Sequence, residues 1–218
     1  MQRIWNIAKP VVKSQRQIIK DLGVSDILAQ IIINRGITNP KEAADFLKPQ
    51  ISNFISPHEL PDIDSACSRI KKAIKSKEKI MIFGDYDADG ITSTALLKSL
   101  FKKLGLEVIH YLPHRIKEGY GLNRTAVRVA KENFVNLFIS VDCGTSSHTE
   151  IAQLRRANID TIVIDHHQPT TDKLPPALSL INPKRKDSKY SFKDLAGVGV
   201  AYKFAQAVTG RLLEEDLD

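Results

Sequence analysis

The sequence has few of the features that mark secreted or membrane-bound proteins. Two cysteines, Cys67 and Cys143, in 218 residues are too few for a disulfide framework. The longest mainly apolar stretch, residues 27–33, is far shorter than the roughly 20 residues of a membrane-spanning helix. Charges and Pro10 interrupt the N-terminal segment where a signal peptide would need an apolar core. We therefore expect a cytoplasmic protein without a membrane partner.

Basic residues outnumber acidic ones. The 32 Lys and Arg residues against 25 Asp and Glu residues give a formal net charge of +7. A basic surface attracts phosphates and speeds encounters with polyanions, so a nucleic acid is a candidate partner. The hydrophobic share of 42% is enough for one good core with a smaller appended region.

Two helix-start signals lie in the first 60 residues. Ser25 precedes an apolar stretch and can cap a helix. Asn39 can cap another, with Pro40 at its first position and Glu42 three residues after the cap. Residues 48–62 then have the composition of an irregular linker.

From residue 62 onward, short apolar runs alternate with helical patterns. The runs expected to be strands are residues 79–84, 106–112, 136–141, 160–165 and 177–182. This alternation is typical of βαβ units. The sequence therefore predicts an α/β fold, a mostly parallel sheet with helices on both faces, in a domain of residues 61–218. A small helical N-terminal region, residues 1–60, precedes it.

Carboxylates and histidines follow three of these strands directly. They are Asp85, Asp87 and Asp89 after the first strand, Asp142 after the third, and Asp165, His166 and His167 after the fourth. Because the carboxyl ends of parallel strands share one edge, we expect these groups in one crevice. Oxygen and nitrogen donors together suit Mn²⁺ or a similar divalent ion. Two ions roughly 3.5–4 Å apart would neutralise the carboxylates and activate a water against a phosphate ester.

Each residue alone also has a structural interpretation. Asp85 and Asp142 could cap a turn or a helix. The spacing of Asp87 and Asp89 occurs in calcium loops, although the glutamate that completes an EF-hand is missing after Gly90. A single histidine is usually a packed or surface residue. Three such clusters on one expected edge favour a metal site.

The segments around these residues resemble a known family. GDYDADG, VDCG and DHH are similar, in order and context, to motifs I, II and III of the DHH phosphoesterase superfamily. The wider segments FGDYDADGITSTALL, YLPHRIKEGYGL, SVDCGTS, VIDHHQP and AGVGVAYKFAQAV resemble the RecJ single-strand-specific exonucleases. The upstream NRGITNPKEAADFLKPQ does so too, and the resemblance covers nearly the whole chain.

The resemblance implies a role for each matched residue. The positions of its metal ligands are occupied here by Asp87, Asp89, Asp142 and His166. They would hold two divalent ions, Mn²⁺ before Mg²⁺, with Asp142 bridging the two. His167 would touch the scissile phosphate and complete the catalytic set. Asp165 would orient a histidine, and Asp85 would lie beside the ligands.

Two further segments are candidates for substrate binding. Arg115 offers a bidentate fork to phosphate, and Tyr120 offers a flat face to a base or sugar. The alternative is a surface loop with a packed tyrosine. Gly197 and Gly199 open a helix whose N–H groups could face a phosphate. A tight helix–strand contact would explain the same glycines.

The function that the resemblance implies is metal-dependent hydrolysis of phosphodiesters. The substrate would be single-stranded DNA, cleaved 5′→3′ by an exonuclease in recombination and repair. Single-strand-binding proteins or other repair proteins would be candidate partners. Two alternatives stay open: a DHH phosphodiesterase on short oligonucleotides or cyclic dinucleotides, and a non-catalytic nucleic-acid-binding or scaffold protein.

The chain ends at EEDLD, before the place where the family has a fourth motif with a further aspartate and then a second domain. The acidic residues that precede that place are Glu214, Glu215, Asp216 and Asp218. None matches the missing aspartate in context. We therefore expect one metal to lack a ligand and this chain alone to be weak or inactive.

Overall fold

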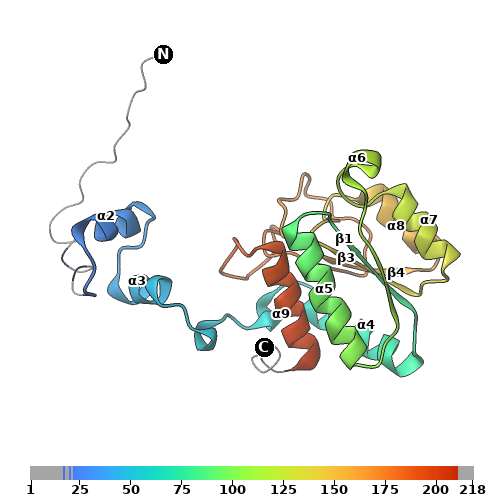
Figure 1. Cartoon of the computed structure of the whole chain (residues 1–218), viewed down its shortest axis with the longest axis horizontal. Helices are drawn as coiled ribbons and strands as arrows, with labels where there is room; N and C mark the ends of the chain where they lie inside the picture. The colour runs from blue at the N-terminus through green and yellow to red at the C-terminus, as the bar shows by residue number, and fades with distance from the viewer. Residues whose placement is uncertain (1–16, 18–19, 21, 211–218) are drawn as a thin grey trace, which may run out of the picture. The chain divides into compact units, whose positions relative to one another are not determined.

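The computed structural model describes Gln17, Lys20 and residues 22–210 of the chain. The chain divides into two compact units, Met1–Phe54 and Ile55–Asp218 (Figure 1). The sequence predicts a domain boundary near residue 60, and the division between the two units falls between Phe54 and Ile55. Four acidic residues discussed above lie outside the described residues: Glu214, Glu215, Asp216 and Asp218.

The helices α2 (Asp26–Asn34) and α3 (Pro40–Leu47) of the first unit begin at the expected caps. In α2, the Ser25 hydroxyl accepts a hydrogen bond from an amide of the first turn at 3.3 Å. In α3, the Asn39 side chain accepts one from the Glu42 amide at 2.8 Å. These caps satisfy amides that have no partner inside the helix. Both predicted helix starts are confirmed.

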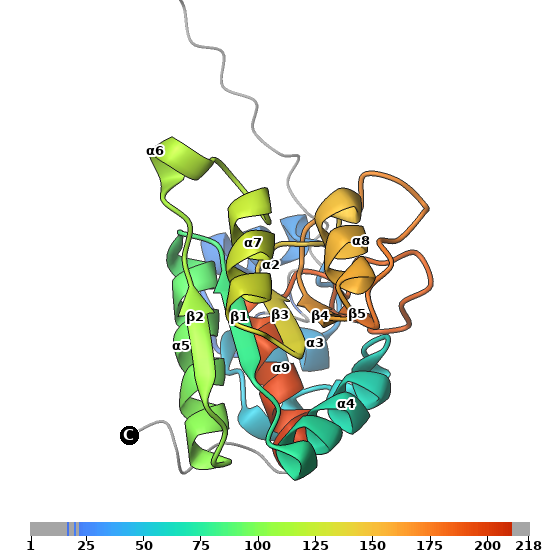
Figure 2. The ribbon, with the colours of Figure 1, turned by 90° about the vertical axis from the view of Figure 1, so that its right-hand side faces the viewer.

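The second unit is built on a sheet whose described strands all run parallel to their neighbours. They are β1 (Ile80–Gly84), β2 (Val108–Tyr111), β3 (Leu137–Val141), β4 (Asp160–Ile164) and β5 (Ser179–Ile181). Their order across the sheet is β2-β1-β3-β4-β5 (Figure 2). The predicted α/β fold is confirmed.

Helices cover both faces of this sheet (Figure 1). One face carries α4 (Ile63–Ser76), α5 (Ala88–Lys103) and α9 (Gly197–Thr209). The other face carries α7 (Arg124–Glu132) and α8 (His148–Arg156). Because helices cover both faces, β1, β3 and most of β4 are buried, mainly apolar runs, whereas the edge strand β2 is only partly buried.

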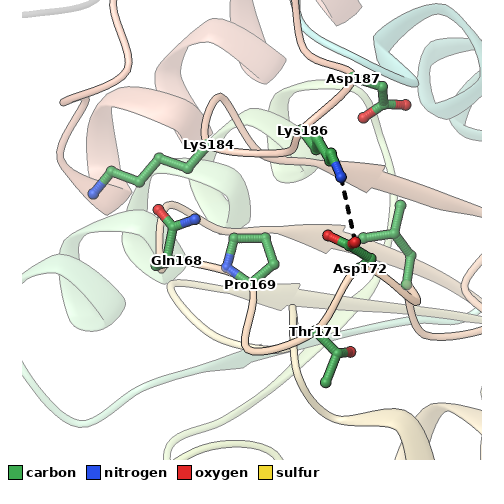
Figure 3. Close-up of a pocket in the computed structure, with 8 residues that line it drawn as sticks. Gln168, Pro169, Thr171, Asp172, Lys184, Lys186 and Asp187 are labelled. Carbon is green, nitrogen blue, oxygen red and sulfur yellow. Dashed lines mark hydrogen bonds and ion pairs between the residues drawn. The ribbon is translucent and has the colours of Figure 1, made fainter.

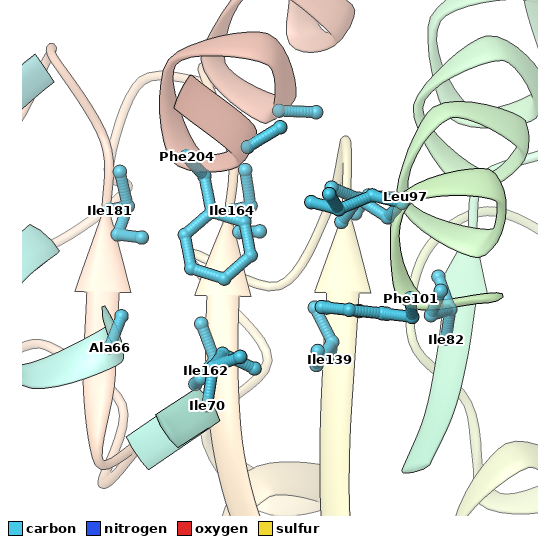
Figure 4. Close-up of a cluster of buried hydrophobic side chains, with 14 of the residues drawn as sticks. Ala66, Ile70, Ile82, Leu97, Phe101, Ile139, Ile162, Ile164, Ile181 and Phe204 are labelled. Atoms are coloured by element: carbon cyan, nitrogen blue, oxygen red, sulfur yellow. The ribbon is translucent and has the colours of Figure 1, made fainter. Parts of the chain in front are cut away.

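The core is therefore split by the sheet into two layers. Successive strand residues point to opposite faces, so Ile82 packs toward α4, α5 and α9 while Phe83 packs toward α7 and α8. In the first layer, Phe204 of α9 lies over Ile164 of β4 (Figure 4). These fully buried side chains hold the strand ends, and the polar residues after them, in fixed positions.

Three single helical turns lie in segments where the sequence predicts a linker or a loop. They are η1 (Ile51–Asn53), η2 (Pro57–Glu59) and α6 (Arg115–Glu118). The first two lie in residues 48–62, so the expected irregular linker is partly ordered. Turns of three or four residues are too short to show an apolar period in the sequence.

The direction in which strands are added reverses between β1 and β3. From β1 the chain crosses through α5 to β2 at one edge, and from β2 it crosses through α7 to β3 on the other side of β1. Such a reversal opens a crevice at the carboxyl ends of the two central strands. Asp85 and Asp142, the residues directly after β1 and β3, stand at that crevice.

Candidate metal centre

Asp142 is the most constrained carboxylate of the crevice. It follows β3 in the left-handed region at φ 61°, and its side chain is 1% exposed. Its amide donates to the Ile164 carbonyl at 2.9 Å, which continues the ladder between β3 and β4. Neither carboxylate oxygen meets a hydrogen-bond donor within the described part of the chain.

The electrostatics of Asp142 favour a bound cation. Burial, and then the nearby Asp87 carboxylate, raise the pKa of Asp142 to about 8. A buried carboxylate without donors is costly, whereas a divalent ion would supply the charge that its oxygens lack. The residue thus fits a metal better than it fits a purely structural role.

Two groups of ligand atoms meet at this residue. One consists of Asp142, His166 and His167, and the other of Asp85, Asp87 and Asp142. Within each group the donor atoms lie within 4.8 Å of one another. Since Asp142 belongs to both, the arrangement could hold two neighbouring ions with one shared carboxylate.

Asp85 and Asp87 are held by the turn between β1 and α5. Asp87 caps α5 by accepting the Gly90 amide at 3.1 Å, a bond that lowers the pKa of Asp87. Asp85 is 1% exposed and accepts the Tyr86 amide through Oδ1 at 2.8 Å. Burial raises its pKa, and its Oδ2 has no donor among the described residues. A Cβ on Gly90 would come within 2.3 Å of the Asp85 carbonyl oxygen, so the turn requires glycine there.

His166 presents one nitrogen to Asp142. Its Nδ1 lies 2.8 Å from the Leu195 carbonyl oxygen. A carbonyl can only accept, so Nδ1 carries the proton and, in the neutral ring, Nε2 keeps its lone pair. That Nε2 lies 3.2 Å from Asp142 Oδ1. Metal-binding histidines usually have their second nitrogen fixed in this way.

Asp165 is buried too, but its carboxylate is saturated with donors. Oδ1 accepts from the amides of His166 and His167 at 2.7 and 3.1 Å, and Oδ2 accepts from the Thr145 amide at 2.9 Å. Burial acts to raise the pKa of Asp165, but these bonds and one from the His167 ring outweigh it, so the pKa is lowered. Asp165 therefore orients its neighbours as an anion.

His167 links Asp165 to the rim of the crevice. Its Nδ1 lies 2.7 Å from Asp165 Oδ1, and this bond raises the pKa of His167. Its Nε2 lies 3.0 Å from the Tyr120 hydroxyl. Burial raises the pKa of Tyr120, so the hydroxyl stays protonated. The pair forms a hydrogen-bonding edge beside the ligand cluster.

Asp89 lies apart from both ligand groups. Its Oδ2 accepts the Gly197 amide at 3.0 Å, and its Oδ1 faces the Val198 amide at 3.4 Å. These amides belong to the first turn of α9, so they are not open to a phosphate as the sequence suggests for Gly197. Gly199 instead faces Leu195, whose Cδ2 would be 3.3 Å from an added Cβ.

Arg115 lies on the ring of Tyr86, with its guanidinium carbon 5.0 Å from the ring centroid. The sequence pattern does not predict a role for Tyr86, although this aromatic residue lies between Asp85 and Asp87. The Leu195 carbonyl was also missed, since a backbone oxygen leaves no trace in the residue pattern. This oxygen contacts His166 only because the folded chain brings the start of α9 beside the residues that follow β4.

Two cavities share Gln168, the residue after His167. One, of about 500 Å³, is lined by residues that include Tyr120, Thr145 and His167. The other, of about 600 Å³, holds Gln168 and Lys184 at one end and a Lys186–Asp172 ion pair of 3.3 Å at the other (Figure 3). Both cavities are lined in part by residues that follow the carboxyl end of β4.

No helix among the described residues has both the length and the apolar character needed to cross a bilayer.

Comparisons with known proteins point to one family. A family model described as "DHH family, N-terminal domain" matches residues 79–217. The chain is 39% identical over 214 residues to the single-stranded-DNA-specific exonuclease RecJ of Bacillus subtilis, covering 98% of this chain and 27% of the relative. Against RecJ of Thermus thermophilus it is 31% identical over 210 residues, covering 95% and 29%. The chain thus spans less than a third of the length of these two curated relatives.

Solved structures give the same result. The crystal structure of exonuclease RecJ bound to manganese matches with a TM-score of 0.66 and 32% identity, covering 72% of this chain and 40% of that one. The structure of RecJ in complex with Mn²⁺ from Thermus thermophilus matches with a TM-score of 0.74 and 27% identity, covering 94% and 28%.

Proposed function

Because this chain belongs to the DHH family, we propose that it binds two divalent metal ions at Asp142 and hydrolyses phosphodiester bonds of single-stranded DNA. The observation that carries the proposal is the sharing of Asp142, buried and without donors among the described residues, between two groups of metal-ligand atoms. A site built only for stability would have supplied donors to that carboxylate, as it does to Asp165.

The proposed metal is Mn²⁺, with Mg²⁺ as the second choice. Similar proteins have been solved with manganese and with magnesium. The donor set of carboxylates and imidazole suits such ions. Neither cysteine belongs to the two ligand groups: Cys67 is buried in α4, and the buried Cys143 sulfur faces the Val141 carbonyl at 3.6 Å.

The proposed roles follow from the contacts. Asp87, Asp142 and His166 hold the ions, and Asp85 adds a further oxygen. Asp89 is retained as a proposed ligand through the lone pairs that the α9 amides leave unused. When bound, the ions would activate a water and offset charge on the phosphate.

Other side chains would bind and orient the substrate. The bond to Asp165 raises the pKa of His167, and the protonated ring can donate from Nδ1 to Asp165 and from Nε2 to a phosphate oxygen. Arg115, supported on Tyr86, offers a fork to the same or the neighbouring phosphate. Tyr120, which is 60% exposed, presents its ring to the terminal base or sugar.

The choice of substrate rests on the relatives and on charge. The RecJ proteins matched here are named as single-stranded-DNA-specific exonucleases, and the net charge of +7 favours a polyanion. We extend the proposal to 5′→3′ polarity, to recombination and repair, and to single-strand-binding proteins as partners. A cytoplasmic location belongs to the same proposal.

A nuclease assay with matched substrates tests this function. The chain is incubated with Mn²⁺ and 5′-labelled or 3′-labelled single strands, the same sequence as a duplex, and dinucleotides. The expected result is slow release of mononucleotides from single strands, lost with EDTA or in Asp142→Asn. Preferential turnover of dinucleotides would favour the short-oligonucleotide alternative. DNA binding without any Mn²⁺-dependent cleavage, unchanged in Asp142→Asn, would favour a non-catalytic role.

A further inference from the structure

One short backbone segment contacts three of the proposed ligands. Residues 195–199 comprise the two residues before α9 and the start of its first turn, and are called the α9 entry segment. The segment meets His166 from the end of β4, Asp142 from the end of β3, and Asp89 from the first turn of α5. These three residues are widely separated in the sequence, so a single segment contacts the parts of the chain that follow β1, β3 and β4.

The first contact fixes the proton of His166. The Leu195 carbonyl accepts from Nδ1 at 2.8 Å, which leaves Nε2 facing Asp142. Because the acceptor is a backbone oxygen, its position depends on the path of the chain and not on a side-chain rotamer. A displacement of the entry segment would free the ring to flip or to change tautomer.

The second contact depends on the absence of a side chain. A Cβ at Gly197 would lie 2.3 Å from Asp142 Oδ1 and 2.8 Å from its Cγ. Asp142 is 1% exposed and is itself held in a left-handed conformation, so it has little room to retreat. The entry segment is thus packed directly against the carboxylate shared by both ligand groups.

The third contact orients Asp89. Its two oxygens face the amides of Gly197 and Val198 at 3.0 and 3.4 Å. The N-terminus of a helix favours a carboxylate, since its amides lack partners inside the helix. Each bond uses one lone pair of an oxygen, so the remaining lone pairs stay available to a cation.

We propose that the α9 entry segment positions the metal centre and that Gly197 is the residue on which this positioning depends. The inference rests on the proposed metal-binding function and goes beyond it, because it assigns a role to backbone groups that bind neither metal nor substrate. Such outer groups typically change metal affinity by about 10–100-fold when they are disturbed.

Gly199 provides a matched control. It lies in the same turn of α9, but an added Cβ would meet only the Leu195 side chain, at 3.3 Å from Cδ2. A flexible leucine can move by a few tenths of an ångström. Gly197→Ala and Gly199→Ala therefore make the same chemical change in one helix turn, and only the first presses on a proposed ligand.

The experiment is calorimetric Mn²⁺ titration of the 218-residue chain and the two variants, with circular dichroism and thermal melts of the metal-free forms. We expect Gly197→Ala to fold and to bind Mn²⁺ about 10–100-fold more weakly, and Gly199→Ala to stay within about threefold of the parent. A purely structural role would lower the melting temperature of Gly197→Ala without changing its affinity, and that result would overturn the inference.

A second measurement keeps the inference testable if Gly197→Ala does not fold. In ¹⁵N-labelled parent protein, Mg²⁺ titration should shift the amide resonances of Gly197 and Val198 with the same midpoint as that of Asp142. Unmoved Gly197 and Val198 resonances in a protein that binds Mg²⁺ would contradict the inference alone. A parent chain that binds neither ion would contradict the proposed function itself.

Discussion

Three aspartates of the crevice share the same burial but differ in their hydrogen bonds. Asp85, Asp142 and Asp165 are each 1% exposed. Asp165 collects backbone and imidazole donors and its pKa is lowered, whereas Asp142 has no donor among the described residues and its pKa rises to about 8. Burial alone therefore does not mark a functional carboxylate; burial without donors does.

This contrast predicts opposite effects of the same substitution. Asp142→Asn removes a buried charge that lacks donors, and asparagine tolerates the left-handed backbone. We expect it to raise the free energy of unfolding of the metal-free chain by about 1–3 kcal/mol at pH 8. Asp165→Asn replaces one of two acceptor oxygens by an NH2 group that cannot accept, so we expect a loss of similar size. Urea denaturation in EDTA measures both, and a loss for both variants would contradict the account of Asp142.

The raised pKa of Asp142 also predicts how stability depends on pH. The folded-state pKa of about 8 lies above the unfolded value of about 3.9, so between them the folded chain binds the extra proton. Asp142 therefore contributes stability below about pH 4, and this contribution is lost as the pH rises through about 8. The advantage of Asp142→Asn should widen between pH 5 and 8 and level off above. Metal-free denaturation curves across this range measure it, and a difference that does not change with pH would contradict the shift.

Among the helices and strands, those with a clear hydrophobic pattern were predictable and the single turns were not. The strands from β1 to β5 and the long helices follow from buried apolar runs and from caps such as Asn39. The residues that the structure brings together in the candidate site could be predicted where they closely follow a strand, as Asp85, Asp142 and His166 do. The bond from Asp89 to α9 could not, because it joins residues 108 positions apart that only the folded chain brings together.

The short helix α6 yields a prediction about substrate binding. Its first residue, Arg115, lies over Tyr86, and such a cation–π contact contributes roughly 0.5–1 kcal/mol at an exposed site. Tyr86→Leu should weaken binding of a single-stranded oligonucleotide by about two- to fivefold, by the same energies, while Tyr86→Phe should keep it. Fluorescence anisotropy in Ca²⁺ or EDTA measures this, and equal affinities for the two variants would show that the ring does not support Arg115.

At the scale of the whole molecule, the candidate metal-binding residues gather at one edge of the parallel sheet, the edge formed by the carboxyl ends of its strands. The strand order reverses between β1 and β3, and the residues that could hold a metal ion follow the carboxyl ends of β1, β3 and β4. The sequence resemblance to the DHH family is confirmed by the family model. Charge alone identified neither the edge nor the substrate, because net charge says nothing about where the basic residues lie.

The difference between the two edges of the sheet predicts which lysines contribute to DNA binding. Lys184 follows β5 at the edge that carries the ligands, whereas Lys77 ends α4 just before β1, at the opposite edge. Each phosphate contact contributes a slope of about −0.7 to the salt dependence on single strands. Lys184→Ala should reduce the slope by roughly that amount, and Lys77→Ala should leave it unchanged. Equal slopes for the two variants would indicate that the strand does not follow this edge.

Titration of Mn²⁺ into the chain and into Asp142→Asn most directly tests whether one shared carboxylate builds the metal centre. Because Asp142 belongs to both ligand groups, the substitution should abolish all specific Mn²⁺ binding, whereas His166→Ala should weaken only the binding at its own group. If the parent chain binds no Mn²⁺, or if Asp142→Asn binds as tightly as the parent, the proposed metal centre is wrong.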